Sequence, residues 1–152
     1  MSVTVRPFRI EDAERVGELM VPLGYPQVDA ETVFARVERL VQGAPFNVFV
    51  AELAGLVVGW VHVAWYVNLI TGGYAEVCAL VVDEGCQRRG VGKKLIAAAE
   101  AWAVEATQAD RIRLGSGVHR TEAHKFYESM GYTTQRASYV FQKPLQTVTE
   151  RS

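Results

Sequence analysis

A short basic loop with two glycines is the part of this sequence best suited to chemistry. Residues 87–93 read QRRGVGK, and they lie between an apolar run, Val77 to Val82, and a long stretch with helical periodicity. The first N–H groups of a helix have no partner within the helix and lie at the positive end of its dipole, so they bind anions. Glycine lets a phosphate approach the backbone without meeting a Cβ. The loop therefore predicts a phosphate site at a helix N-terminus.

Two common phosphate-binding motifs do not fit this loop. The nucleoside-triphosphate loop requires lysine directly after its second glycine, but counting from Gly85 the second glycine is Gly90 and Val91 follows it. The dinucleotide motif requires Gly-x-Gly-x-x-Gly, and counting from Gly90 its third glycine would fall at Leu95. The phosphate ligand is therefore of another kind.

Size and composition indicate one soluble domain. The chain has 152 residues, of which 49% are hydrophobic and 22% charged, so it can bury a core without a metal or disulfide. A net charge of -1 argues against a dedicated nucleic-acid binder. No apolar run approaches the roughly 18 residues of a membrane span, and the start has no signal-peptide core. We expect a cytoplasmic protein with Cys78 and Cys86 reduced.

Hydrophobic periodicity predicts the elements that position the loop. Strands are expected at residues 3–8, 46–53, 56–67, 74–83 and 111–114, with one or two closing strands in 132–144. Helices are expected from Glu11 to about Leu23, after Asp29 as N-cap, over 90–107, and over 121–130 with Gly131 at its end. This order predicts an α/β fold: one domain over 1–145 with a mixed central sheet and helices on both faces. A frayed tail, 146–152, follows.

The loop resembles the signature of one enzyme family. Gln87, Gly90 and Gly92 match the [Gln/Arg]-x-x-Gly-x-[Gly/Ala] pattern of the GNAT (GCN5-related) N-acetyltransferases. Leu80 and Val82 also resemble the Leu-x-Val ending of the strand that precedes this loop in the family.

A second match lies downstream. The stretch from Phe126 to Tyr132 resembles the family's Phe-Tyr-x-x-x-Gly-Phe/Tyr ending, and the resemblance covers essentially the whole chain, most strongly residues 76–132. Arg120 stands where many members carry Asn, which departs from the family at a contact to the pantetheine arm.

The resemblance implies a single-domain GNAT fold in which acetyl-CoA lies in a V-shaped splay between the central parallel strands 74–83 and 111–116. The strand end would pair with the pantetheine arm as an added strand would. The loop amides would hold the pyrophosphate, and no metal is implied. The cofactor-binding residues expected on this basis are Leu80, Val81, Val82, Gln87, Arg88, Arg89, Gly90, Val91, Gly92 and Lys93.

The implied chemistry is direct attack of a primary amine on the thioester. An alkyl ammonium with a pKa near 10.4 costs roughly 4 to 5 kcal/mol to deprotonate at pH 7, so a base or a water chain to one is needed. Glu76 enters an otherwise apolar strand and is the candidate base, unless it only marks the wet end of that strand. Tyr127 resembles the family's general acid for the CoA thiolate, with a core position as its alternative. Glu122 and His119 are further candidates.

Other polar residues are given less active roles. His62 and His124 are expected at the surface or in packing, and Cys78 in the core. Tyr25, Trp65 and Tyr66 are candidates for an aromatic wall that binds the acceptor amine by cation–π contact.

These features predict an N-acetyltransferase that uses acetyl-CoA and a primary amine, either of a small molecule such as an aminoglycoside or polyamine, or of a peptide or protein. The expected partners include neither nucleic acid nor membrane, and a homodimer is possible. The alternatives are a non-catalytic acyl-CoA-binding regulatory module and an enzyme of the same fold that uses a longer acyl-CoA.

Overall fold

The computed structural model describes residues 2–87 and 89–147. The chain divides into two compact units, Met1–Gly115 and Ser116–Ser152, and each is described by itself. The single domain over 1–145 thus stays a prediction, and most of the predicted tail lies outside the described residues.

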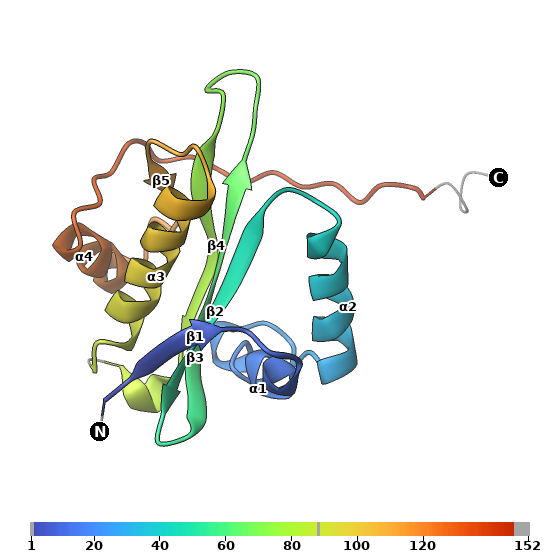
Figure 1. The fold of residues 1–152 in the computed structure, drawn as a ribbon. Helices are drawn as coiled ribbons and strands as arrows, with labels where there is room; N and C mark the ends of the chain where they lie inside the picture. Colours follow the sequence, from blue (N-terminus) through green and yellow to red (C-terminus); the bar gives the residue numbers. More distant parts are fainter. Residues whose placement is uncertain (1, 88, 148–152) are drawn as a thin grey trace. The chain divides into compact units, whose positions relative to one another are not determined.

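The first unit is built on one mixed sheet (Figure 1). Five strands lie in the order β1-β2-β3-β4-β5, antiparallel from β1 to β4 and parallel between β4 and β5. They are β1 (Thr4–Pro7), β2 (Phe46–Leu53), β3 (Leu56–Tyr66), β4 (Tyr74–Val82) and β5 (Ile112–Arg113). The strands predicted at 3–8, 46–53, 56–67, 74–83 and 111–114 are all present, the last one as two residues only.

Helices cover both faces of this sheet, as predicted (Figure 1). On one face, α1 (Ala13–Glu18) and α2 (Ala30–Val41) close a core that includes Trp60 and Val81. On the other face lies α3 (Val91–Ala106). A Cβ built at Gly59 would touch Val91 and Leu95, so the neighbouring positions of β3 alternate between the two helical layers.

The helix predicted from Glu11 to Leu23 is shorter than expected. Only α1 is α-helical, and it lies between two 3-10 turns, η1 (Ile10–Asp12) and η2 (Val21–Leu23). Pro22 lacks the N–H that would continue the helical ladder, so the regular helix ends before it. The cap of α2 is confirmed: the Asp29 carboxylate accepts a 2.8 Å hydrogen bond from the Thr32 N–H.

The second unit contains α4 (Thr121–Ser129), which Gly131 ends in a left-handed conformation (φ 93°), as predicted. The closing strands predicted in 132–144 are wrong, because residues 132–147 contain neither helix nor strand. Tyr139, Val140 and Phe141 are about nine-tenths exposed. A strand is stable when a neighbour pairs with its backbone, and no such ladder is described for this segment.

A buried ion cluster fixes the start of the sheet. The Arg6 guanidinium donates two 2.8 Å hydrogen bonds to the Asp12 carboxylate and one of 2.6 Å to Glu52. Asp12 is only 5% exposed and also accepts the Arg9 N–H. Burial alone would raise the pKa of Asp12, but the hydrogen bonds and charges of Arg6 and Arg9 outweigh it and lower that pKa.

Asp12→Asn is expected to lower the free energy of unfolding at pH 7 by about 2 to 3 kcal/mol, because Arg6 loses its buried partner. The folded-state pKa of Asp12 is depressed, so its stabilisation is full above the unfolded-state value near 3.9 and is lost as the pH falls through the folded-state value. Urea unfolding of both proteins should therefore differ at pH 7 and converge towards pH 3. Asp110→Asn is the control, because the Asp110 side chain is 80% exposed; an equal loss there would contradict the assignment.

No helix among the described residues has the length and apolar character needed to cross a membrane.

Candidate functional site

The loop after β4 is anchored by an ion pair at its start. Asp83 follows the last residue of β4, and its carboxylate accepts a 2.5 Å hydrogen bond from Arg15 and one of 2.9 Å from the Gly85 N–H. Arg15 also donates to the carbonyl of Val57, which ties α1 to the sheet at this point. The loop therefore leaves the sheet from a fixed position.

Gly90 opens α3 in a left-handed conformation, with φ at 78°. A Cβ built there would meet nothing within 4 Å, so the backbone faces open space. No side chain caps the first turn of α3, and Val91, 1% exposed, fixes that turn against the sheet. The first-turn N–H groups are thus presented at an open, electropositive helix end, as an anion site requires.

The polar and charged residues around this turn differ in their contacts. Gln87, Arg89 and Lys93 are exposed, whereas the Lys94 ammonium donates a 2.8 Å hydrogen bond to the Val3 carbonyl. Lys94 therefore anchors β1 and contributes less to the loop than its position in the sequence suggests. Arg88, predicted to bind the cofactor, lies outside the described residues.

The ladder between β4 and β5 is short. It pairs Ala75 with Ile112 and Glu76 with Arg113, and the remainder of β4 extends beyond these two pairs. Leu80, Val81 and Val82 form that extension; Val81 is buried and the other two are half-buried. The structure thus leaves the strand end that should pair with a pantetheine arm outside the β5 ladder.

Glu76 lies half-buried in the middle of the sheet, between Ala64 of β3 and Arg113 of β5 in the register. Two residues earlier is Tyr74, and the guanidinium of Arg113 lies over its ring, 4.4 Å from the ring centroid. The Tyr66 ring meets Tyr74 edge-on at 5.2 Å. Glu76 is therefore a strand residue beside a tyrosine–arginine cluster, and not at a wet strand end.

Cys78 is exposed and not a core residue, which corrects the prediction. The register of β3 and β4 shifts beside it, between His62 and Val63, so the simple alternation used to place it fails. Desolvation by surrounding protein atoms and the charge of Glu76 raise the pKa of its thiol to about 11. Cys78 is thus a protonated thiol at neutral pH, which is unsuited to nucleophilic attack.

The residues predicted to form an aromatic acceptor wall do not share one surface. Tyr25 is 63% exposed in the segment after η2. Trp65 and Tyr66 are consecutive in β3, so their side chains point to opposite faces. The Trp65 indole lies against Gly73, where an added Cβ would come within 2.7 Å of the ring.

Tyr127 belongs to the second unit and is half-buried in α4. Its ring meets those of Phe126 and Tyr132 at 5.2 and 6.0 Å. Burial raises the pKa of its phenol, and the charge of Arg120 offsets this only in part. The phenol therefore stays protonated at neutral pH and can donate a proton. In the same unit His119 and Glu122 are exposed, and His124 Nε2 lies 2.8 Å from the Gly117 carbonyl oxygen, a packing role.

His62 is a residue whose surroundings the sequence did not reveal. It packs on Phe46 with the rings 6.0 Å apart and edge-on, which confirms a packing contact, but its Nε2 is buried without a hydrogen-bond partner. Burial lowers the pKa of its imidazole. The sequence signal that could have placed His62 on the same face as Trp60 was its position two residues later in a predicted strand.

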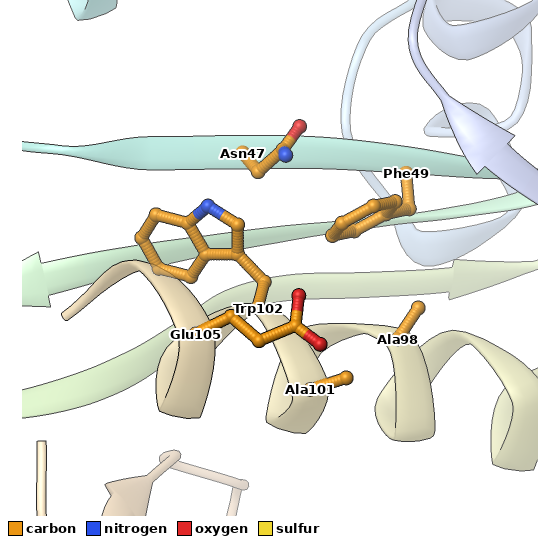
Figure 2. Close-up of a pocket in the computed structure, with 6 residues that line it drawn as sticks. All are labelled: Asn47, Phe49, Ala98, Ala101, Trp102 and Glu105. Carbon is orange, nitrogen blue, oxygen red and sulfur yellow. The ribbon is translucent and has the colours of Figure 1, made fainter.

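A cavity of about 350 Å³ lies between β2 and α3, and none of the described residues predicted for the site lines it. Figure 2 shows Asn47 and Phe49 of β2 facing Trp102 and Glu105 of α3 across it. Its lining includes no member of the loop or of β4, so it is not part of the candidate site. Within residues 2–87 and 89–147, no group of three or more His, Cys, Asp and Glu side chains is arranged to hold a metal.

Comparison with known proteins identifies the class. The model of the Acetyltransferase (GNAT) family matches residues 14–132. An uncharacterized N-acetyltransferase of Bacillus subtilis (strain 168), YhdJ, is 31% identical over 120 residues, which cover 78% of this chain and 82% of that protein.

Solved structures show the same fold. Glucosamine-6-phosphate N-acetyltransferase from Arabidopsis thaliana superimposes with a TM-score of 0.80 at 19% identity, covering 93% of this chain and 99% of that one. AAC(6')-Iy in complex with the bisubstrate analog CoA-S-monomethyl-acetylneamine gives a TM-score of 0.80 at 18% identity, covering 95% and 100%. The family model and the Bacillus subtilis relative define the class as an acyltransferase, and the chain belongs to the GNAT acetyltransferase family. It is an acetyl-CoA-dependent N-acetyltransferase of that family.

Proposed function

We propose that this enzyme acetylates a primary amine of a small molecule by direct attack on acetyl-CoA held at the start of α3. The observation that carries the proposal is Gly90, whose left-handed backbone opens an uncapped helix turn onto open space. The pyrophosphate would accept hydrogen bonds from the amides of residues 87–93, with Arg89 and Lys93 nearby as exposed cations.

The pantetheine arm would pair with the end of β4. The two-pair ladder between β4 and β5 supports a V-shaped splay there, because the strand continues for six residues after its last pair, from Val77 to Val82. An extended ligand can add to such an edge as a strand does. The thioester would then lie near Glu76, where the β4–β5 pairing begins.

The proposed acid–base roles follow from the surroundings of each group. Glu76 would take a proton from the acceptor ammonium, and Tyr127, whose pKa is raised, would protonate the departing thiolate. The protonated state of Cys78 supports direct attack over a covalent acyl-cysteine.

For the acceptor we propose an amino sugar. The two structural relatives described above carry an amino sugar phosphate or an acetylated neamine in their names, and both cover nearly all of this chain. The acceptor would bind beside Tyr25 and the Tyr66–Tyr74 pair. The exposed Tyr139, Val140 and Phe141 support a homodimer, because burial against a second copy would remove this apolar surface from water.

The test is calorimetric titration with acetyl-CoA followed by a thiol-release assay on glucosamine-6-phosphate, neamine, spermidine and a lysine peptide. We expect binding in the micromolar range and turnover with an amino sugar. Binding without turnover on any amine would favour the acyl-CoA-binding regulatory module. Tighter competition by longer acyl-CoAs would favour a different acyl donor.

Glu76→Gln is expected to lower kcat/KM at pH 7 by about 100-fold, because the acceptor ammonium loses its base. The loss should shrink as the pH approaches the pKa of the amine, which then deprotonates by itself. Glu38→Gln, an exposed change on α2, is the control for the charge. A loss for Glu76→Gln that is constant across the pH range would contradict the role of base.

A further inference from the structure

Two ring nitrogens on one strand are buried without a hydrogen-bond partner: Trp60 Nε1 and His62 Nε2. A buried polar group left unpaired loses the hydrogen bonds that water would give it, so such groups need an explanation. The two residues are two apart in β3 and therefore point to the same face. Trp60 belongs to the core beneath α1 and α2, which places His62 on that face as well.

The strand register brings Glu76 to the same face. In the register, His62 pairs with Ala79 and Ala64 pairs with Glu76. His62 and Ala64 are two residues apart in β3 and share a face, so the register shift after His62 leaves Ala79 and Glu76 on that same face. Residues paired directly across strands share a face, and diagonal neighbours have Cβ atoms about 7–8 Å apart. Glu76 is thus a diagonal neighbour of His62 on the adjacent strand, within reach of two long side chains.

Glu76 is the carboxylate that the β3–β4 register places diagonally beside His62 on this face. The residues paired with His62 across the sheet, Val48 and Ala79, are apolar, and the Phe46 ring packs edge-on against the imidazole. The hydrophobic core of this face includes Ala13 and Val16 of α1, Leu19 directly after α1, and Val33 of α2.

An ion pair and one further arginine lie at the two ends of the group formed by Trp60, His62 and Glu76. The Arg15–Asp83 pair lies at the Val57 end of β3, beyond Trp60, and Arg113 lies across Glu76 on β5. Because burial lowers the pKa of His62, the imidazole is neutral at neutral pH and one ring nitrogen can accept a proton.

We propose that His62 is a proton-relay residue that receives, through Glu76, the proton removed from the acceptor amine. The inference rests on the proposed function and extends it to a residue on a neighbouring strand. The acceptor ammonium gives one proton to the Glu76 carboxylate, which passes it to the imidazole and is regenerated. The imidazolium then returns that proton to solvent.

The remaining steps balance without another reactant. The amine lone pair forms the C–N bond at the thioester carbonyl, and the C–S bond breaks. The thiolate takes the proton of the Tyr127 phenol, and the phenolate takes the second proton from the new amide nitrogen. The net products are the acetamide, CoA thiol and one proton.

The experiment compares wild type, His62→Gln and His62→Phe on two acceptors over pH 6–10. The preferred alkyl amine of the acceptor panel is protonated at pH 7, whereas phenylhydrazine is not and needs no base. Both variants should lose about 10-fold or more in kcat/KM for the alkyl amine at pH 7, and less at high pH. With phenylhydrazine both should match wild type.

Each contrary outcome has a separate meaning. Equal losses on both acceptors, or wild-type rates in His62→Phe, would show that the ring only packs and would overturn the relay alone. Acetyl-CoA binding and unfolding temperatures are measured on each variant, so that a misfolded protein is recognised; if Gln and Phe both misfold, His62→Asn takes their place. Wild-type protein that binds acetyl-CoA and acetylates no amine would overturn the proposed function and the relay together.

Discussion

Gly90→Asp should weaken acetyl-CoA binding by at least about 100-fold, the largest effect expected of any single change in this protein. Gly90 has a left-handed backbone that aspartate and asparagine tolerate better than other side chains, and an added Cβ meets no protein atom. The new carboxylate would stand at the helix end where the pyrophosphate binds. Two like charges about 4 Å apart near a protein surface repel by several kcal/mol, enough for this loss.

Gly90→Asn is the matched control, because it has the same shape and backbone demand without the charge. Calorimetric titration of both variants with acetyl-CoA, at two salt concentrations, separates the two contributions. The Asn variant should bind within about 10-fold of wild type, and the defect of the Asp variant should shrink at high salt. Equal binding by wild type and the Asp variant would show that the pyrophosphate does not bind at this helix end.

Tyr127→Phe should lower kcat by about 100-fold while acetyl-CoA binding stays unchanged, because the thiolate loses its proton donor. The pKa of Tyr127 is raised by burial, so the wild-type phenol remains protonated at neutral and mildly alkaline pH. Wild-type kcat should therefore fall only at strongly alkaline pH. The kcat of the Phe variant should not show this alkaline decrease.

Tyr139→Phe is the control for this change, since Tyr139 is 89% exposed and the substitution removes the same hydroxyl. Steady-state rates of both variants from pH 6 to 11 provide the comparison. A kcat for Tyr127→Phe that equals wild type at every pH would mean that the phenol only packs against Phe126 and Tyr132.

Local patterns were sufficient for most of the fold. β-branched and aromatic residues predicted β2 with β3 as its hairpin partner, and a continuous apolar run predicted β4. The Asp29 and Gly131 caps were predicted from single residues with known backbone preferences. The glycine-bearing loop was also recognisable, because an anion site at a helix start depends on neighbours in the chain. The roles of Glu76 and Tyr127 remain predictions.

Features that depend on distant partners were not predictable in this way. The run from Tyr132 to Pro144 has strand-forming residues, yet it makes no ladder in the structure, since pairing requires a neighbour that the run itself does not supply. Cys78 was misplaced because a register shift between β3 and β4 changes which face a residue meets. The early end of the first helix is different, because Pro22 is a local signal that the continuing apolar periodicity obscured.

The sequence alone therefore specified the order of the elements up to α4, the glycine-bearing loop between β4 and α3, and the family, all of which depend on residues close together in the chain. Tertiary structure alone decided that His62 and Glu76 share a sheet face and that Lys94 is bound to the Val3 carbonyl. Strand register and burial set these relations, and both arise only when segments far apart in the sequence pack together.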